Sequence, residues 1–150
     1  MFKRLFAASI WASGNIRPED WRFRGIFRVV LPVGNLIFLY FGVVGFARGV
    51  GSVTDATNTT YAAFWSGAIA LASLACLVGV AFPKLGKLEL GAKIVLIGLV
   101  ASYVAVLTAR SFEVPGSQAT AGLMSALIVL PVWRVLALGF QLRKQKRVIE

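Results

Sequence analysis

The chain contains four long runs of apolar residues, and nearly all of its charged residues fall between them. The runs cover residues 26–47, 61–82, 91–109 and 119–140. Each is close to the roughly 20 residues that an α-helix needs to cross a hydrocarbon core. Membrane strands need only about 9–11 residues and alternate in polarity, which these runs do not. Since backbone groups must be satisfied internally in lipid, we expect an all-α integral membrane bundle of four transmembrane helices.

The composition agrees with this class, because 58% of the residues are hydrophobic and only 15% are charged, against about 25% charged in ordinary soluble domains. We predict a cytoplasmic amphipathic segment over residues 1–25, a transmembrane domain over 26–140 and a basic cytoplasmic tail over 141–150. Asn58, Thr59 and Thr60 are expected to cap the second helix. Pro83 is expected to end that helix.

The basic residues are distributed unevenly among the segments outside the runs. Of 16 lysines and arginines, only Arg48 and Arg110 fall in the two connections assigned to the outside. Short cytoplasmic segments carry such an excess, so both termini are predicted to lie in the cytoplasm and the protein in the cytoplasmic (inner) membrane. The net charge of +10 is therefore interpreted as a topology signal and an attraction to anionic lipids, not as a nucleic-acid-binding surface.

The first sixteen residues form a separate pattern. Phe2, Leu5 and Phe6 share one helical face beside two basic residues. A signal peptide would need a longer apolar core, whereas this one is short and broken by serines. We therefore expect an N-terminal amphipathic interfacial helix, with Trp11 and Trp21 at headgroup depth.

Groups that carry catalysis or bind metals are scarce in the sequence. There is no histidine, the single cysteine is Cys76, and all six acidic residues fall outside the four runs. Glu89 in particular falls in the connection over residues 83–93, which is predicted to be a short basic inner loop. We expect no carboxylate or imidazole relay within the membrane, no metal or cofactor, and no enzyme activity.

Three polar side chains do fall within the runs, namely Arg28, Asn35 and Arg134, and we call them the intramembrane polar seam. The favoured interpretation of both arginines is that they snorkel to lipid phosphates. The alternative places them between helices or around a pore. Asn35 lacks the reach to snorkel, so it should bond to another helix or to the carbonyl of residue 28, which Pro32 leaves without its amide.

Small residues recur at helical spacing in three of the runs, which allows helices to approach closely. We interpret them as helix packing within one chain, with an oligomer interface as the alternative. The predicted packing positions are Ala68, Ala72, Gly79, Gly98, Ser102, Gly122 and Ala126.

The segment RPEDW at residues 17–21, leading into LPVGN at 31–35, resembles small membrane proteins encoded by phages of actinobacteria. The resemblance covers about the first third of the chain and supplies no catalytic residue. Such proteins are often called holin-like. The resemblance implies a homo-oligomer that permeabilises the cytoplasmic membrane. The alternative is a non-catalytic membrane subunit or scaffold that binds a partner through its basic cytoplasmic face.

Overall fold

The computed structural model describes residues 8–12, 15, 25–112 and 117–149, and these are helical almost throughout, with no strand among them. Four helical segments are long and apolar enough to cross a membrane: Ile26–Arg48, Thr59–Ala81, Pro83–Arg110 and Ser117–Phe140. The expectation of an all-α protein with four membrane-crossing helices is therefore confirmed. Because it has these four helices, the chain is a multi-pass membrane protein.

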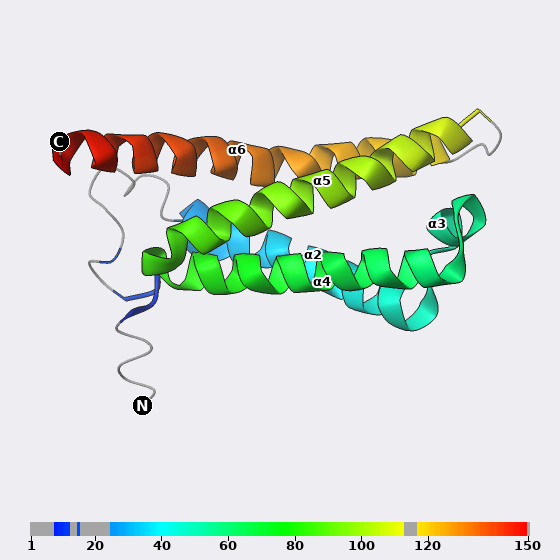
Figure 1. The fold of residues 1–150 in the computed structure, drawn as a ribbon, viewed down its shortest axis with the longest axis horizontal. Coiled ribbons are helices and arrows are strands. Elements are labelled where there is room, and N and C mark those ends of the chain that lie inside the picture. Colours follow the sequence, from blue (N-terminus) through cyan, green and yellow to red (C-terminus); the bar gives the residue numbers. More distant parts are fainter. Residues whose placement is uncertain (1–7, 13–14, 16–24, 113–116, 150) are drawn as a thin grey trace.

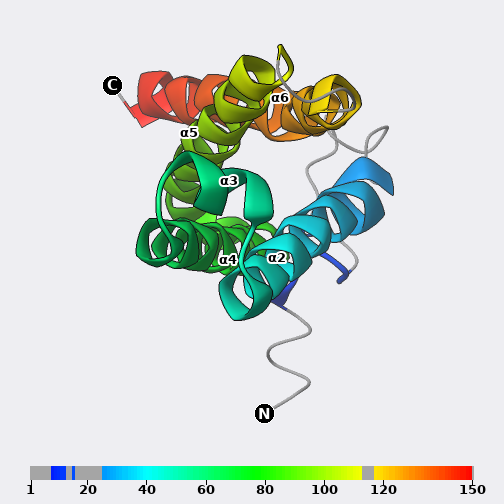
Figure 2. The ribbon, with the colours of Figure 1, turned by 90° about the vertical axis from the view of Figure 1, so that its right-hand side faces the viewer.

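The helices follow one another up and down the molecule (Figure 1). The π-helix η2 (Ile26–Val30) leads into α2 (Leu31–Arg48), and the short α3 (Gly51–Ala56) precedes α4 (Thr59–Ala81). A 3-10 turn, η3 (Pro83–Leu85), joins α4 to α5 (Gly86–Arg110), and α6 (Ser117–Ile149) is last. Each long helix packs mainly on its neighbours in the chain, so α2 packs on α4, α4 on α5 and α5 on α6, while α2 barely touches α6. Viewed along the helices, the four form an open arc (Figure 2).

The helix ends follow the local sequence. The side chain of Asn58 accepts a hydrogen bond from the Tyr61 amide at 2.7 Å, so the predicted cap of α4 is confirmed at Asn58, while Thr59 and Thr60 lie within the helix. α2 ends before Gly49, whose φ of 77° suits a residue without a Cβ. α4 ends at Ala81, shortly before Pro83, as predicted.

Close approach of α2 to α4 depends on a glycine. A Cβ on Gly42 would lie 2.6 Å from the Ala70 amide nitrogen and 2.9 Å from the Ser66 carbonyl oxygen. The main core lies next to this contact. In it, the rings of Phe41, Trp65 and Tyr103 pack together, with centroids 5.2 to 6.2 Å apart.

Much of the outer surface is apolar. Tyr40, Phe64 and Leu71 each expose more than two thirds of their area (72%, 75% and 71%). Helices that are hydrophobic on all sides suit a lipid environment, and this surface agrees with the four membrane-crossing segments.

The expected amphipathic helix falls largely on residues 1–7 and 13–14, which lie outside the described ranges, as does Trp21. The described part of this segment docks on the bundle. Ile10 is buried against Phe27, Leu31 and Val80, and its amide donates to the Ala81 carbonyl at 2.9 Å.

The last transmembrane helix continues into the predicted basic tail. α6 runs without interruption from Ser117 to Ile149, although Pro131 lies within it. The backbone over residues 141–149 therefore continues the helix beyond the boundary at 140.

Candidate functional site

A buried ion pair joins α5 to α6. Arg134 donates from Nε to Oε1 of Glu89 at 2.7 Å and from its Nη2 to Oε2 at 2.9 Å, which is the two-pronged geometry that makes arginine–carboxylate pairs strong. Arg134 is 7% exposed and Glu89 is 1% exposed. The guanidinium also lies 4.7 Å from the centre of the Phe27 ring, so three elements enclose it.

A second buried contact joins α5 to α2, one helical turn further along. Lys93 donates from Nζ to Oδ1 of Asn35 at 3.3 Å, and both residues are buried. Glu89 and Lys93 are four residues apart on α5, so they share one face of that helix. We call Asn35, Glu89, Lys93 and Arg134 the charged layer, since they lie between α2, α5 and α6.

The layer depends on a small residue in α4. A Cβ on Gly79 would lie 2.6 Å from the Cβ of Glu89 and 2.8 Å from its Cα. Only a residue without a side chain leaves room for Glu89 at this crossing, which explains why α5 can turn its carboxylate inward.

The prediction that residues 83–93 form a short inner loop is wrong. Residues 86–93 are not an inner loop, because α5 begins at Gly86, and the membrane-crossing segment that contains Glu89 and Lys93 is Pro83–Arg110. The signal was present in the sequence, because Glu89 and Lys93 have the i, i+4 spacing of a helix face. It was missed because Glu89 precedes the apolar run at residues 91–109 and Lys93 lies near the start of that run.

The snorkelling interpretation is also wrong for Arg134, which turns inward to Glu89 and is buried. Of the two partners expected for Asn35, the structure shows the one on another helix, Lys93. Within the polar seam, Asn35 and Arg134 are thus brought into one layer through α5.

Arg28 does not join that layer. This half-buried side chain donates from Nε to the Ile10 carbonyl at 3.2 Å and from Nη2 to the Ala12 carbonyl at 3.4 Å. The Trp11 indole in turn donates to the Arg28 carbonyl at 3.2 Å. Pro32 cannot donate to this carbonyl because proline has no backbone N–H. Arg28 therefore fastens the N-terminal segment to the first membrane helix.

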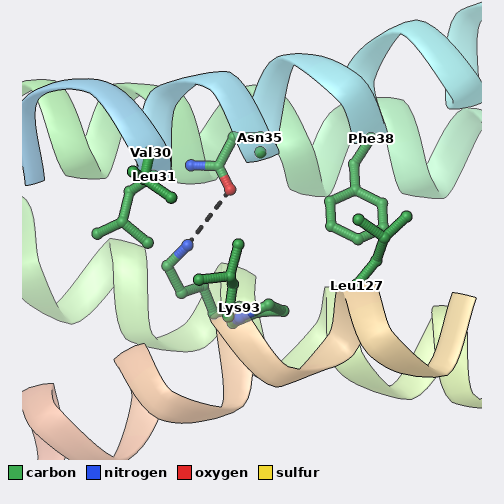
Figure 3. A pocket seen from close by; sticks show the side chains of 9 residues that line it. Val30, Leu31, Asn35, Phe38, Lys93 and Leu127 are labelled. Carbon is green, nitrogen blue, oxygen red and sulfur yellow. Dashed lines mark hydrogen bonds between the residues drawn. The ribbon is translucent and has the colours of Figure 1, made fainter. Parts of the chain in front are cut away.

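A cavity lies beside the charged layer, between α2, α5 and α6 (Figure 3). Its wall is apolar apart from Asn35 and Lys93, and it includes Phe38 from α2 and Leu127 from α6. The Nδ2 atom of Asn35 has no hydrogen-bond partner among the described residues. Both polar side chains that line this cavity are therefore almost completely covered by protein.

The predicted packing positions divide between the inside and the outside of the chain. Ala72 and Gly79 are buried and Ala68 is half-buried, all on α4. Ser102 accepts a hydrogen bond from the Trp65 indole at 3.2 Å. Gly98, Gly122 and Ala126 are exposed, so within this one chain they do not pack against another helix.

The groups present limit the chemistry. Among the described residues, no three His, Cys, Asp or Glu side chains gather where they could hold a metal ion. The charged layer can fix the helices relative to one another. Compared with protein-family models, curated proteins and solved structures, the chain matches none of them.

Proposed function

We propose that this chain is a non-catalytic multi-pass membrane subunit that binds a partner through its basic end. The observation that carries the proposal is that the charged side chains of the charged layer find their partners within one chain. Arg134 pairs with Glu89 and Lys93 with Asn35, all buried. A pore would instead need such groups to face a lumen, since a channel works through the polar groups that line it.

The charge distribution supports a binding surface at one end. Lys84 and Lys87 are exposed at the turn between α4 and α5, where Ile10 also docks. The basic tail extends from the same end of the bundle (Figure 1). At the opposite end, Arg110 is paired with Asp55 at 3.1 Å. By the positive-inside rule, the basic end and both termini would lie on the cytoplasmic side of the inner membrane.

The test is site-specific photo-crosslinking in the native host. A crosslinking amino acid at Lys87 should give one discrete protein adduct, and the same probe at the exposed Asp55 should not give that adduct. Replacing Lys84 by Glu in the Lys87 probe variant should weaken the adduct, because a rim charge contributes to recognition. The absence of any protein adduct at Lys87 would overturn the proposal.

A second function, the holin-like one, is favoured by a different observation. Nothing lies within 4 Å of a Cβ placed on Gly98 or Gly122, so a helix of a second copy has room to approach these faces. A holin-like protein should form large particles and release dye from vesicles. Gly122→Leu should then reduce both particle size and leakage. A wild-type protein that leaves vesicles tight would rule this function out.

A further inference from the structure

A groove runs along the outer surface of the bundle between α4 and α5. The two helices touch where Gly79 meets Glu89, and they diverge from there toward α3 (Figure 1). One side of the groove is formed by residues of α4 between 68 and 75, and the other by residues of α5 between 87 and 95. We call it the α4–α5 groove. Its volume is about 540 Å³, within the roughly 300–1,000 Å³ of small-molecule sites.

Small residues form the floor of this groove, and larger ones stand at its edges. Ala72 is buried and Ala92 is half-buried. At the edges, Leu71 is 71% exposed and Val95 is 54% exposed. The side chains that line the groove are apolar except for Lys87. The α4–α5 groove is therefore an apolar depression with a single cationic group on its wall.

The groove occupies one half of the membrane-crossing region. Ala68 lies near the middle of the α4 segment, Thr59–Ala81, and Val95 near the middle of the α5 segment. From Lys87 to Val95 the helix rises about 12 Å at 1.5 Å per residue. This length is close to half of a hydrocarbon core about 30 Å thick. The groove therefore extends from the basic end to about the centre of the membrane, which is the depth of one lipid leaflet.

Lys87 lies at the end of the groove that faces the membrane surface. The segment Pro83–Arg110 has 28 residues, whereas about 20 cross the hydrocarbon core. Lys87 is near the start of this segment, so it falls close to the boundary of the core, where lipid phosphates begin. Its side chain is exposed and takes part in neither of the two ion pairs that the described residues form. Its ammonium group is therefore open to an anion from the lipid.

We propose that the α4–α5 groove binds an anionic phospholipid of the leaflet at the basic end. One acyl chain lies in the groove over the small residues, and a phosphate oxygen accepts a charge-assisted hydrogen bond from the Lys87 ammonium. A transmembrane helix of a partner fits less well, because it would cross both leaflets, whereas the groove spans one. The inference does not rest on the proposed subunit function, since its test contains purified protein and lipid without a partner.

Two glycines of α5 provide a matched pair of variants. Gly91 lines the groove, and nothing lies within 4 Å of a Cβ placed on it. Gly91→Leu should therefore fill the groove without disturbing the helix contacts. Gly98 lies two turns further along nearly the same face and is equally open, but it is beyond the groove. Gly98→Leu thus adds the same side chain outside the site.

Two exposed lysines at the basic end provide a second pair. Lys87 lines the groove, whereas Lys84, three residues earlier, is not among the residues that line it. Lys87→Met removes the proposed phosphate contact and keeps most of the length of the side chain. Lys84→Met removes the same charge from the same end of the bundle, so it controls for a general attraction between a basic surface and anionic lipid.

The experiment places the full-length protein in phosphatidylcholine vesicles with a small amount of phosphatidylglycerol that carries a photoactivatable diazirine on one acyl chain. After illumination, mass spectrometry quantifies the adducts on residues 68–75 and 91–95. Phosphatidylcholine with the same photoactivatable chain should give about fivefold fewer adducts there, as expected for one lysine near the membrane surface. Lys87→Met should lower the phosphatidylglycerol adducts by the same factor, and Gly91→Leu should remove most of them. Lys84→Met and Gly98→Leu should leave them unchanged.

Three results would overturn the proposal. Equal adducts from the two lipids would be those of the lipid that surrounds any membrane helix. Adducts that survive Gly91→Leu would place the lipid outside the groove. The third result is an absence of groove adducts in the wild type, and a dimer that Gly91→Leu dissociates would then identify a second copy as the occupant. The comparison of the two lipids needs only the wild type, so the test stays decisive if a variant fails to fold.

Discussion

Glu89 and Arg134 illustrate how much a single side chain can matter once it is buried. Both charges have left water, and each depends on the other to be tolerated. We expect Glu89→Gln to lower the free energy of unfolding by about 3 kcal/mol, because it leaves the Arg134 guanidinium unpaired. The double change Glu89→Leu with Arg134→Met should recover most of that loss. Chemical unfolding in detergent measures both.

The control for this pair is the exposed ion pair at the other end of the bundle. Asp55 is 62% exposed in its pair with Arg110, so Asp55→Asn should change the unfolding free energy by less than about 1 kcal/mol. If Glu89→Gln is as mild as Asp55→Asn, the pair between α5 and α6 does not hold the helices together.

The contacts of individual side chains could be predicted from the sequence only in part. Asn35 was identified because an amide cannot snorkel, and that reasoning led to a contact with another helix. The partners of Arg134 and Lys93 could not be predicted, since 45 and 58 residues separate them from Glu89 and Asn35. Such pairings depend on helix rotation, which a single sequence does not determine.

Two helix glycines distinguish a crowded crossing from an open face. Gly79→Ala should destabilise the protein by about 1–3 kcal/mol, because the added methyl group would meet the α5 backbone. Gly98→Ala, in contrast, should be neutral or stabilise by up to about 1 kcal/mol, since alanine favours a helix and space is free there. Unfolding of both variants in the same detergent tests this, and equal effects would contradict the crossing at Glu89.

Among the elements, the apolar runs predicted α2, α4 and the start of α6 closely because hydrocarbon thickness dictates helix length. The start of α5 was placed about one turn and a half too late. Hydropathy detects the part of a helix that lipid surrounds, whereas Glu89 and Lys93 are covered by protein. The short α3 was also missed, because the Gly- and Thr-rich outer connection carries no apolar periodicity.

For the molecule as a whole, we predict that the turn at Lys84 and the loop at Asp55 lie on opposite sides of the membrane. In a Cys76→Ala background, Lys84→Cys should react with a membrane-impermeant maleimide only in inverted vesicles. Asp55→Cys should react in intact cells. Labelling of both positions from the same side would contradict the crossing by α4.

The unbroken course of α6 has a mechanical consequence. From Arg134 to Ile149 the helix contains no proline, and this stretch is about 22 Å long at 1.5 Å per residue. A continuous helix rotates as one body, so a ligand that binds residues 141–149 and rotates them would turn the Arg134 guanidinium relative to Glu89. A continuous helix therefore connects residues 141–149 to the one ion pair that α6 makes with α5 among the described residues.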